Sequence, residues 1–134
     1  MRRFWTLLLT PVLAVAFFMV GSPAANAFGA EVLGCSWNSG PWIANNCGGS
    51  DGLLTFSAHN LSGTYSYSWT LTGYPSLTIV SGCTATSSTC TVDTGDGALR
   101  DHTLTASLTL TQSGQSRTIT AKATVYANGD CLTC

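Results

Sequence analysis

Residues 103–125 alternate between apolar and mostly hydroxyl-bearing side chains, and this period of two constrains the fold more than any other feature of the sequence. The apolar members are, in chain order, Leu104, Ala106, Leu108, Leu110, Ile119, Ala121, Ala123 and Val125. Alternation over this length is typical of half-buried β-strands. Ser113 and Gly114 lie between the two runs and predict the turn of a β-hairpin.

Shorter runs of the same kind lie upstream. Residues 54–59 and 65–72 alternate in the same way, with residues 60–63 expected as the turn between them, and residues 77–80 and 90–93 indicate two further strands. Residues 94–97 are expected to form a connection. No segment of useful length has helical periodicity. We therefore predict an all-β fold, an antiparallel β-sandwich of six or seven short strands, with a small barrel as the alternative.

Few side chains in this chain are charged. Charged residues make up 8% of the sequence. Beyond residue 27 the only basic residues are Arg100, Arg117 and Lys122, against six acidic ones. There is no basic stripe to displace the counterions of a nucleic acid or to bind an anionic membrane, so neither is an expected partner. Solubility must depend on the many Thr and Ser hydroxyls, and β-branched Thr suits the outer face of a sheet.

The first 27 residues have the organisation of a secretory signal peptide. Arg2 and Arg3 precede an apolar run, and small residues at positions 25 and 27 predict cleavage before Phe28. Two alternatives are a retained membrane anchor and a lipoprotein acylated at Cys35. The helix breakers after the apolar run oppose the first, and the distance of Cys35 from that run opposes the second. We expect a secreted or cell-envelope protein, with no membrane contact after cleavage.

All six cysteines lie beyond this leader, which predicts a disulfide-stabilised exported domain. Cys83 and Cys90 flank a loop long enough to turn back on itself and are the first expected pair. The other four could pair locally, Cys35 with Cys47 and Cys131 with Cys134, or could tie the two termini together. We favour the local pairing. The expected layout is a disulfide-pinned loop region at residues 28–52, a β-sandwich core at 53–126 and a cysteine-containing tail at 127–134.

The core resembles a bacterial immunoglobulin-like or PKD-like domain over residues 53–126. The resemblance rests on Tyr67-Ser68-Trp69 in an expected central strand and on the threonine-rich hairpin that ends the domain. It implies an immunoglobulin-like β-sandwich that serves as an adhesive, spacer or ligand-presenting module without chemistry of its own. Two features depart from these families. Trp69 is not followed by a Gly-Asp-Gly turn, and the strands that would carry an antibody-type bridge have no cysteine.

The groups that could suggest acid–base catalysis are His59, His102, Asp96 and Asp101. Adjacent residues on a strand point to opposite faces, so the Asp101-His102 pair is poor evidence for a dyad. The terminal Cys-Leu-Thr-Cys motif is not at the start of a helix, which favours a structural bridge over a redox-active dithiol. The cysteines are also far apart in sequence, which disfavours zinc. We predict no catalytic, cofactor-binding or metal site.

Trp37 and Trp42 are the candidate ligand-binding residues, because they lie in the loop-like N-terminal stretch. Exposed aromatic rings stack on sugars or anchor protein partners, whereas buried ones would cover the open end of the sandwich. The expected function is therefore a non-enzymatic binding or structural module for an unidentified protein or glycan. Alternatives are a carbohydrate-binding module using both tryptophans, and a secreted inhibitor or small-molecule carrier. For the latter, Cys35-Ser36-Trp37 resembles neocarzinostatin-type carriers, although cysteine order and spacing elsewhere differ.

Overall fold

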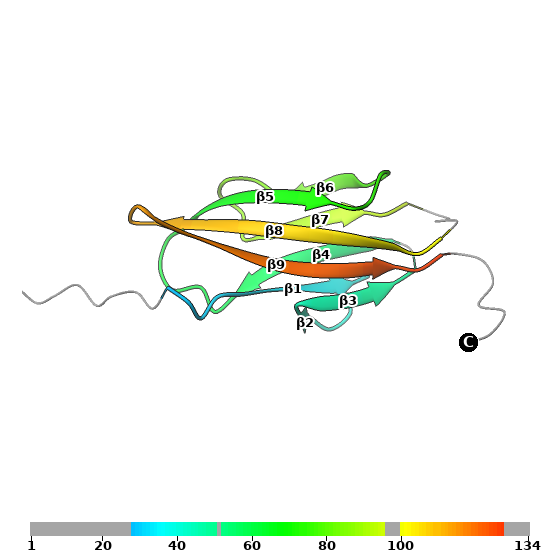
Figure 1. Cartoon of the computed structure of the whole chain (residues 1–134), viewed down its shortest axis with the longest axis horizontal. Coiled ribbons are helices and arrows are strands. Elements are labelled where there is room, and N and C mark those ends of the chain that lie inside the picture. The colour runs from blue at the N-terminus through cyan, green and yellow to red at the C-terminus, as the bar shows by residue number, and fades with distance from the viewer. Residues whose placement is uncertain (1–27, 51, 96–99, 128–134) are drawn as a thin grey trace, which may run out of the picture.

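The computed structural model describes residues 28–50, 52–95 and 100–127. The expected leader, Asp96 and the pair Cys131 and Cys134 lie outside these residues. All the regular secondary structure in the described residues is β-strand, which confirms the all-β prediction (Figure 1). The strands are, in chain order, β1 (Val32–Trp37), β2 (Ile43–Ala44), β3 (Asn46–Gly49), β4 (Leu53–His59), β5 (Ser66–Thr72), β6 (Thr78–Gly82), β7 (Thr89–Asp93), β8 (His102–Gln112) and β9 (Gln115–Val125).

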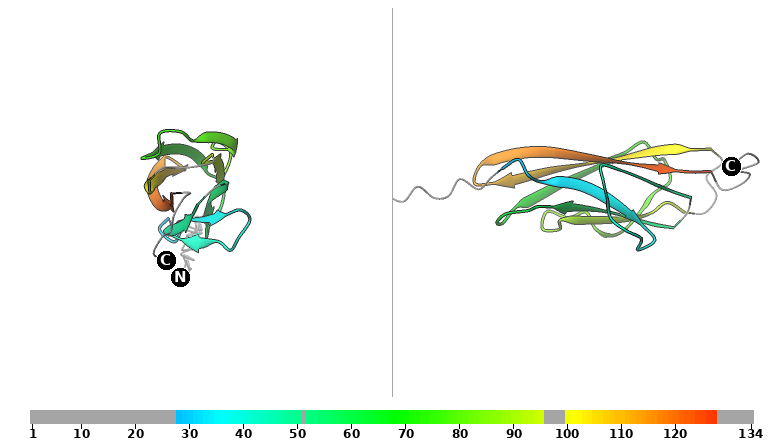
Figure 2. Two further views of the ribbon diagram at one scale, coloured as in Figure 1. Left: turned by 90° about the vertical axis from the view of Figure 1, so that its right-hand side faces the viewer. Right: turned by 90° about the horizontal axis from the view of Figure 1, so that it is seen from below.

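The described strands form two sheets. One sheet has the order β2-β1-β4-β7-β6 and the other β3-β9-β8-β5. Figure 2 shows them as two layers, with the long hairpin of β8 and β9 in one layer and β4 and β7 in the other. Most strand pairs are antiparallel as predicted, but β3 pairs with β9 in parallel. The segment 60–65 crosses from one sheet to the other, since β4 and β5 belong to different sheets.

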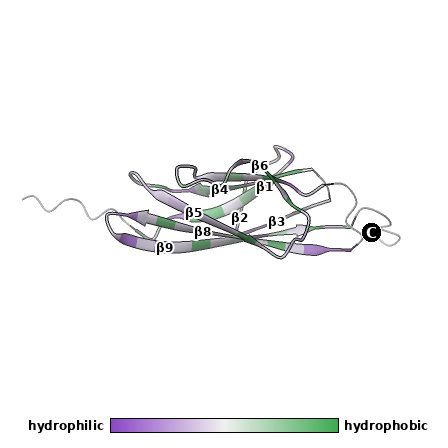
Figure 3. Cartoon of the chain, turned by 90° about the horizontal axis from the view of Figure 1, so that it is seen from above, coloured by the Kyte–Doolittle hydropathy of each residue, from purple (hydrophilic) through white to green (hydrophobic). Residues whose placement is uncertain are grey.

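The hairpin of β8 and β9 is the element that the sequence predicts best. Eleven residue pairs are in register, from His102 opposite Val125 to Gln112 opposite Gln115. Ser113 and Gly114 form the two-residue turn, and both have positive φ, 51° and 78°. This is the signature of a type I′ turn, whose twist matches that of the strands. Figure 3 shows the alternation of apolar and polar residues along both strands.

The outer face of this hairpin carries aligned hydroxyl groups. Thr109 lies opposite Thr118 and Thr111 opposite Ser116, and in both pairs the two hydroxyl oxygens are 2.8 Å apart. Such cross-strand Thr and Ser pairs stabilise a sheet without using charge.

The core lies between the two sheets and is built from the inward-facing residues of both. Its members, all at most 8% exposed, are Leu33, Cys35, Leu54, Phe56, Tyr65, Cys90, Val92, Leu104, Ala106, Leu108, Leu110, Ile119, Ala121 and Ala123. β1, β4, β7, β8 and β9 each contribute alternate residues, as expected when one face of a sheet is buried. The apolar positions predicted for the hairpin are therefore confirmed as core.

β5 is an edge strand and not the expected central strand, since it is the last strand of its sheet, and the disulfide loop after β6 lies along its free side. The N–H of Tyr67 donates to the C=O of Ala85 at 3.0 Å, and the indole N–H of Trp69 donates to the C=O of Ser87 at 2.9 Å. The predicted Cys83–Cys90 bridge is confirmed and closes this loop. An exposed strand edge invites pairing with other chains, so the loop both covers β5 and joins it to the opposite sheet.

The N-terminal stretch contains more regular structure than expected. It holds β1, β2 and β3, and β1 contributes Leu33 and Cys35 to the core. The chain changes sheets at Asn45, whose φ is +66°. Its N–H donates to the C=O of Leu33 on β1 at 3.1 Å, and its C=O accepts from the N–H of Lys122 on β9 at 2.7 Å. Asn is among the residues that tolerate this left-handed conformation best.

The favoured Cys35–Cys47 pairing is confirmed, with Cα atoms 6.0 Å apart. Cys35 belongs to β1 in one sheet and Cys47 to β3 in the other, so this bridge joins the two sheets covalently. Cys35, Cys47 and Cys90 all lie on strands, whereas Cys83 directly follows β6.

Removing the two bridges separately tests their roles in stability. The chain-entropy model gives about 3 kcal/mol for Cys35–Cys47 and about 2.5 kcal/mol for Cys83–Cys90, a small difference. We expect Cys35→Ala with Cys47→Ala to lose about 0.5 kcal/mol more than Cys83→Ala with Cys90→Ala, because it opens the longer loop, whereas each bridge has one completely buried cysteine, Cys35 or Cys90, and leaves a similar cavity. Urea unfolding of both variants measures this. A larger loss in the Cys83 and Cys90 variant would contradict it.

Candidate functional site

Trp37 closes one end of the core. The alternation of β1 places Leu33, Cys35 and Trp37 on the inward face, and Trp37 packs partly buried against the core. Its indole lies directly on the backbone of Gly49 in β3, where any Cβ would collide with the ring. Glycine is therefore required at position 49 for this close approach. Trp37 therefore matches the second of the two expectations for the tryptophans, in which the ring covers the open end of the sandwich.

Trp42 lies on the outer face of the sheet that contains β1. Its ring packs on Gly34 and stacks with the His59 ring, with centroids 4.1 Å apart and planes inclined by 30°. The indole N–H donates to the C=O of Ser57 at 3.3 Å. This leaves Trp42 half-buried, with one ring face covered by His59. Because Gly34 points outward and Trp37 inward, the two tryptophans are on opposite faces of β1 and do not form one aromatic platform.

The residues weighed for acid–base chemistry are dispersed among separate contacts. His59 stacks on Trp42, whereas His102 lies edge-on to the Tyr74 ring at 5.3 Å. Asp101 accepts a hydrogen bond from the backbone N–H of Ala127 at 2.9 Å. His59 and His102 belong to different sheets. Each of these described side chains therefore has a local structural contact, and the fold does not gather them into a dyad.

A buried carboxylate, Glu31, is the polar feature that the sequence analysis missed. Its side chain is completely buried and accepts three hydrogen bonds: from the Gly29 N–H at 2.8 Å, the Tyr65 hydroxyl at 3.0 Å and the Arg117 guanidinium at 2.7 Å. The bond to Arg117 is an ion pair between the start of β1 and β9. The signal was present in the sequence, since position 31 has the same parity as the inward-facing residues 33 and 35.

The hydrogen bonds of Glu31 have a larger effect on the pKa of its carboxyl group than its burial has. Burial raises the pKa of the carboxyl group, but the nearby backbone N–H of Glu31 itself and the three hydrogen bonds from Gly29, Tyr65 and Arg117 lower it, and the net result is a pKa below the usual 4.5. Glu31 is therefore ionised at neutral pH. Because its donors already occupy it, this carboxylate serves as an anchor between the sheets and is not available as a general acid or base.

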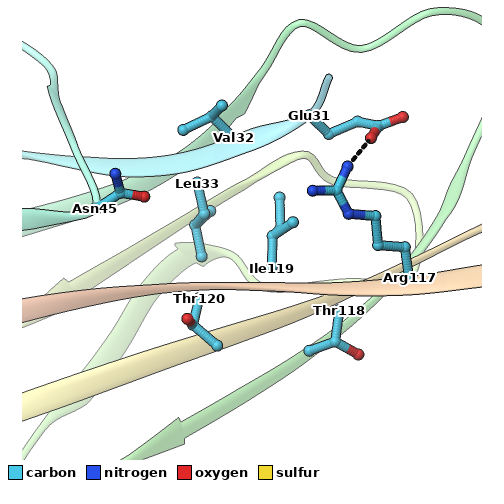
Figure 4. Close-up of a pocket in the computed structure, with 8 residues that line it drawn as sticks. All are labelled: Glu31, Val32, Leu33, Asn45, Arg117, Thr118, Ile119 and Thr120. Carbon is cyan, nitrogen blue, oxygen red and sulfur yellow. Dashed lines mark hydrogen bonds and ion pairs between the residues drawn. The ribbon is translucent and has the colours of Figure 1, made fainter. Parts of the chain in front are cut away.

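A groove of about 340 Å³ runs between β1 and β9, beside this ion pair. Its lining residues are Glu31, Val32, Leu33, Asn45, Arg117, Thr118, Ile119 and Thr120. Figure 4 shows Leu33 and Ile119 pointing toward one another from the two strands, while Thr118 and Thr120 lie on the other side of β9. The Glu31–Arg117 pair closes one end of the groove and Asn45 lies at the other. We call this the β1–β9 groove.

The β1–β9 groove is electrically balanced, since its two charged residues are paired with each other. Its remaining polar groups are hydroxyls, an amide and backbone. This composition suits a neutral, hydrogen-bonding ligand better than an ion. Among the described residues, no group of three or more His, Cys, Asp or Glu side chains is arranged to hold a metal ion.

Comparisons with known proteins return no family model, no curated protein and no solved structure that matches this chain. In the described part of the chain, no helix is long and apolar enough to span a membrane.

Replacing Glu31 should reveal its role through the pH dependence of stability. Its lowered pKa means that its stabilising effect is complete above the unfolded-state value near 4.5 and is lost as the pH falls through the folded-state value. We expect Glu31→Gln to reduce the free energy of unfolding by about 2 kcal/mol at pH 7, because one partner of a buried pair is removed. The difference from wild type should shrink below pH 4.5.

Urea unfolding between pH 3 and pH 7 provides the measurement for Glu31→Gln. Thr118→Val is the control that leaves the ion pair intact, since Thr118 lies next to Arg117 on β9 but on the outer face of that strand. A difference between wild type and Glu31→Gln that stays constant over this range would show that the charge of Glu31 contributes nothing.

The two tryptophans should differ in their effect on stability. Trp37→Ala is expected to cost about 3 kcal/mol, because it removes a large side chain that packs against the core. Trp42→Ala should cost about 1 kcal/mol, since its contacts are on the outer face of the sheet. Urea unfolding compares them, with Trp37→Phe as a conservative control. Equal losses would contradict the assignment of Trp37 to the core end.

Proposed function

We propose that this chain is an exported, non-enzymatic module of immunoglobulin-like type that binds a partner or has a structural role outside the cytoplasm. The observation that carries the proposal is the order of the strands. Constant-type immunoglobulin domains place their first, second, fifth and fourth strands in one sheet and their third, sixth and seventh in the other.

The strands of this chain can be matched to that plan one by one. If β2 and β3 are set aside as additions after the first strand, β1, β4, β7 and β6 correspond to the first, second, fifth and fourth strands. β5, β8 and β9 then correspond to the third, sixth and seventh. This agreement supports an immunoglobulin-like sandwich. The inter-sheet bridge differs from that of antibodies, since it joins the first strand to the added β3.

Two disulfides within the described residues support an oxidising, extracytoplasmic location. The signal-peptide pattern of residues 1–27 is consistent with the same compartment. Cys35 is bonded to Cys47 and is therefore not free to carry a lipid. Immunoglobulin-like modules are used for adhesion, spacing and ligand presentation, which is the role we assign to this chain. Its partner is a protein or a glycan, because the few basic residues offer no surface for nucleic acid.

Carbohydrate binding is the second candidate, and only Trp42 favours it. This half-buried ring lies on an outer face beside His59 and the exposed Ile43. One ring with one covered face provides less stacking area than the two-tryptophan platform that the sequence suggested. Loss of binding on a glycan array after Trp42→Ala, but not after Trp37→Phe, would favour this candidate.

The proposal is tested on the full chain expressed with its leader in a bacterial host. We expect the product outside the cytoplasm, with Phe28 as its first residue and all cysteines oxidised, as measured by intact-mass analysis with and without reduction. A leader-deleted chain is the control and should remain in the cytoplasm. An exported product that turns over a substrate, with the activity lost on one side-chain substitution, would overturn the non-enzymatic assignment.

A further inference from the structure

The backbone of β9 is unpaired along the β1–β9 groove. On one side β9 pairs with β8 over its whole length, but on the other side β3 pairs only with residues 122–125. The N–H of Lys122 points to that second side, where it donates to Asn45. Backbone groups alternate in direction along a strand, so the N–H and C=O of Thr118 and Thr120 point the same way. Within the described residues, no strand or side chain pairs with them.

The edge strands of both sheets in the described chain are covered, interrupted or short. The Cys83–Cys90 loop covers β5, a bulge between Ile79 and Ser81 interrupts β6, and β2 and β3 are only two and four residues long. Bulges, short strands and covering loops are the usual ways in which proteins block unwanted strand pairing. The regular, uncovered stretch of β9 at residues 117–121 has none of these features, and a groove of about 340 Å³ lies directly beside it.

We propose that the β1–β9 groove binds an extended peptide segment of a partner protein, which adds to the sheet as a strand beside β9. This inference rests on the proposed binding role and names its site and ligand class. Thr118 and Thr120 provide alternating N–H donors and C=O acceptors, which is the pattern that an extended backbone complements. The peptide's side chains alternate, with apolar ones facing Leu33 and Ile119 and polar ones facing solvent on the Thr side.

The charges in the groove support a neutral backbone as the ligand. Arg117 and Glu31 neutralise one another at one end, so an ionic ligand finds no unbalanced charge there. The Asn45 bridge to Leu33 and Lys122 closes the other end. The bound segment is therefore short, about four or five residues at the rise of an extended strand.

Proline substitution can remove the binding groups without disturbing β8. The N–H of Thr118 and of Thr120 points away from β8, and proline is tolerated in an edge strand when its missing N–H would face outward. The test variant is Thr118→Pro with Thr120→Pro. The matched control, Thr118→Val with Thr120→Val, alters the same side chains but keeps both N–H donors.

The probe is a phage-displayed library of random seven-residue peptides, selected on the exported full-length chain. We expect enriched peptides with alternating apolar residues that bind wild type and the valine control alike. They should bind the proline variant about tenfold or more weakly, as expected when two hydrogen bonds are lost. Absence of enrichment, or equal binding to the proline variant, would overturn the proposal. Thermal unfolding of both variants checks that they fold.

Hydrogen exchange of the wild-type chain provides a second measurement that needs no variant. In the free protein the amides of Thr118 and Thr120 should exchange fast, while those of Ile119 and Ala121 are protected by β8. The selected peptide should slow exchange at Thr118 and Thr120. Protection of these two amides in the free chain that grows with protein concentration would identify a second copy as the occupant and refute the peptide proposal.

These outcomes test the proposed binding site and the proposed general function independently of each other. A selected ligand that protects amides only elsewhere on the chain refutes the groove but leaves the proposed binding module intact. Turnover of a substrate refutes the proposed function, whereas the exchange pattern at Thr118 and Thr120 still decides whether the groove accepts a strand.

Discussion

The structure depends on connections between the two sheets at both sides of the sandwich, beside β1 and β3 and beside β6 and β5. A disulfide contributes to the connection at each side, but in a different way. Cys35–Cys47 joins the sheets directly, from β1 to β3. Cys83–Cys90 acts indirectly, because it holds a loop whose carbonyl groups accept hydrogen bonds from β5 in the opposite sheet. A small domain buries a limited apolar area. Covalent closure at one side and a fixed loop at the other compensate for this.

The Glu31–Arg117 pair adds a third connection between the sheets, at the end of the core. Desolvation makes a buried carboxylate costly unless hydrogen bonds satisfy it. Here Gly29, Tyr65 and Arg117 supply three donors. Tyr65 lies directly before β5, and Arg117 lies on β9, so a single side chain fixes the start of β1 relative to two strands of the other sheet.

Local sequence patterns predict where the strands lie, but they do not predict which strands that are distant in sequence pair with each other. The β8–β9 hairpin followed from alternation and from the Ser113-Gly114 turn, which are both local features. β1 is not recognisable from the sequence as a core strand. Its inward positions are Leu33, Cys35 and Trp37, and from the sequence alone we interpret Cys35 as a disulfide partner in a loop and Trp37 as a candidate ligand-binding residue. The parallel pairing of β3 with β9 and the groove beside it depend on the change of sheet at Asn45, which no periodicity reveals.

The hydroxyl pairs on the outer face of the β8–β9 hairpin have a consequence for the environments that the protein can tolerate. A surface kept soluble by charge changes its behaviour with ionic strength, since salt screens charges over about 10 Å at 0.1 M. Thr and Ser hydroxyls neither titrate nor attract counterions. The pairs Thr109–Thr118 and Thr111–Ser116 therefore add no charge for salt to screen, so we expect the solubility that this face provides to depend little on ionic strength.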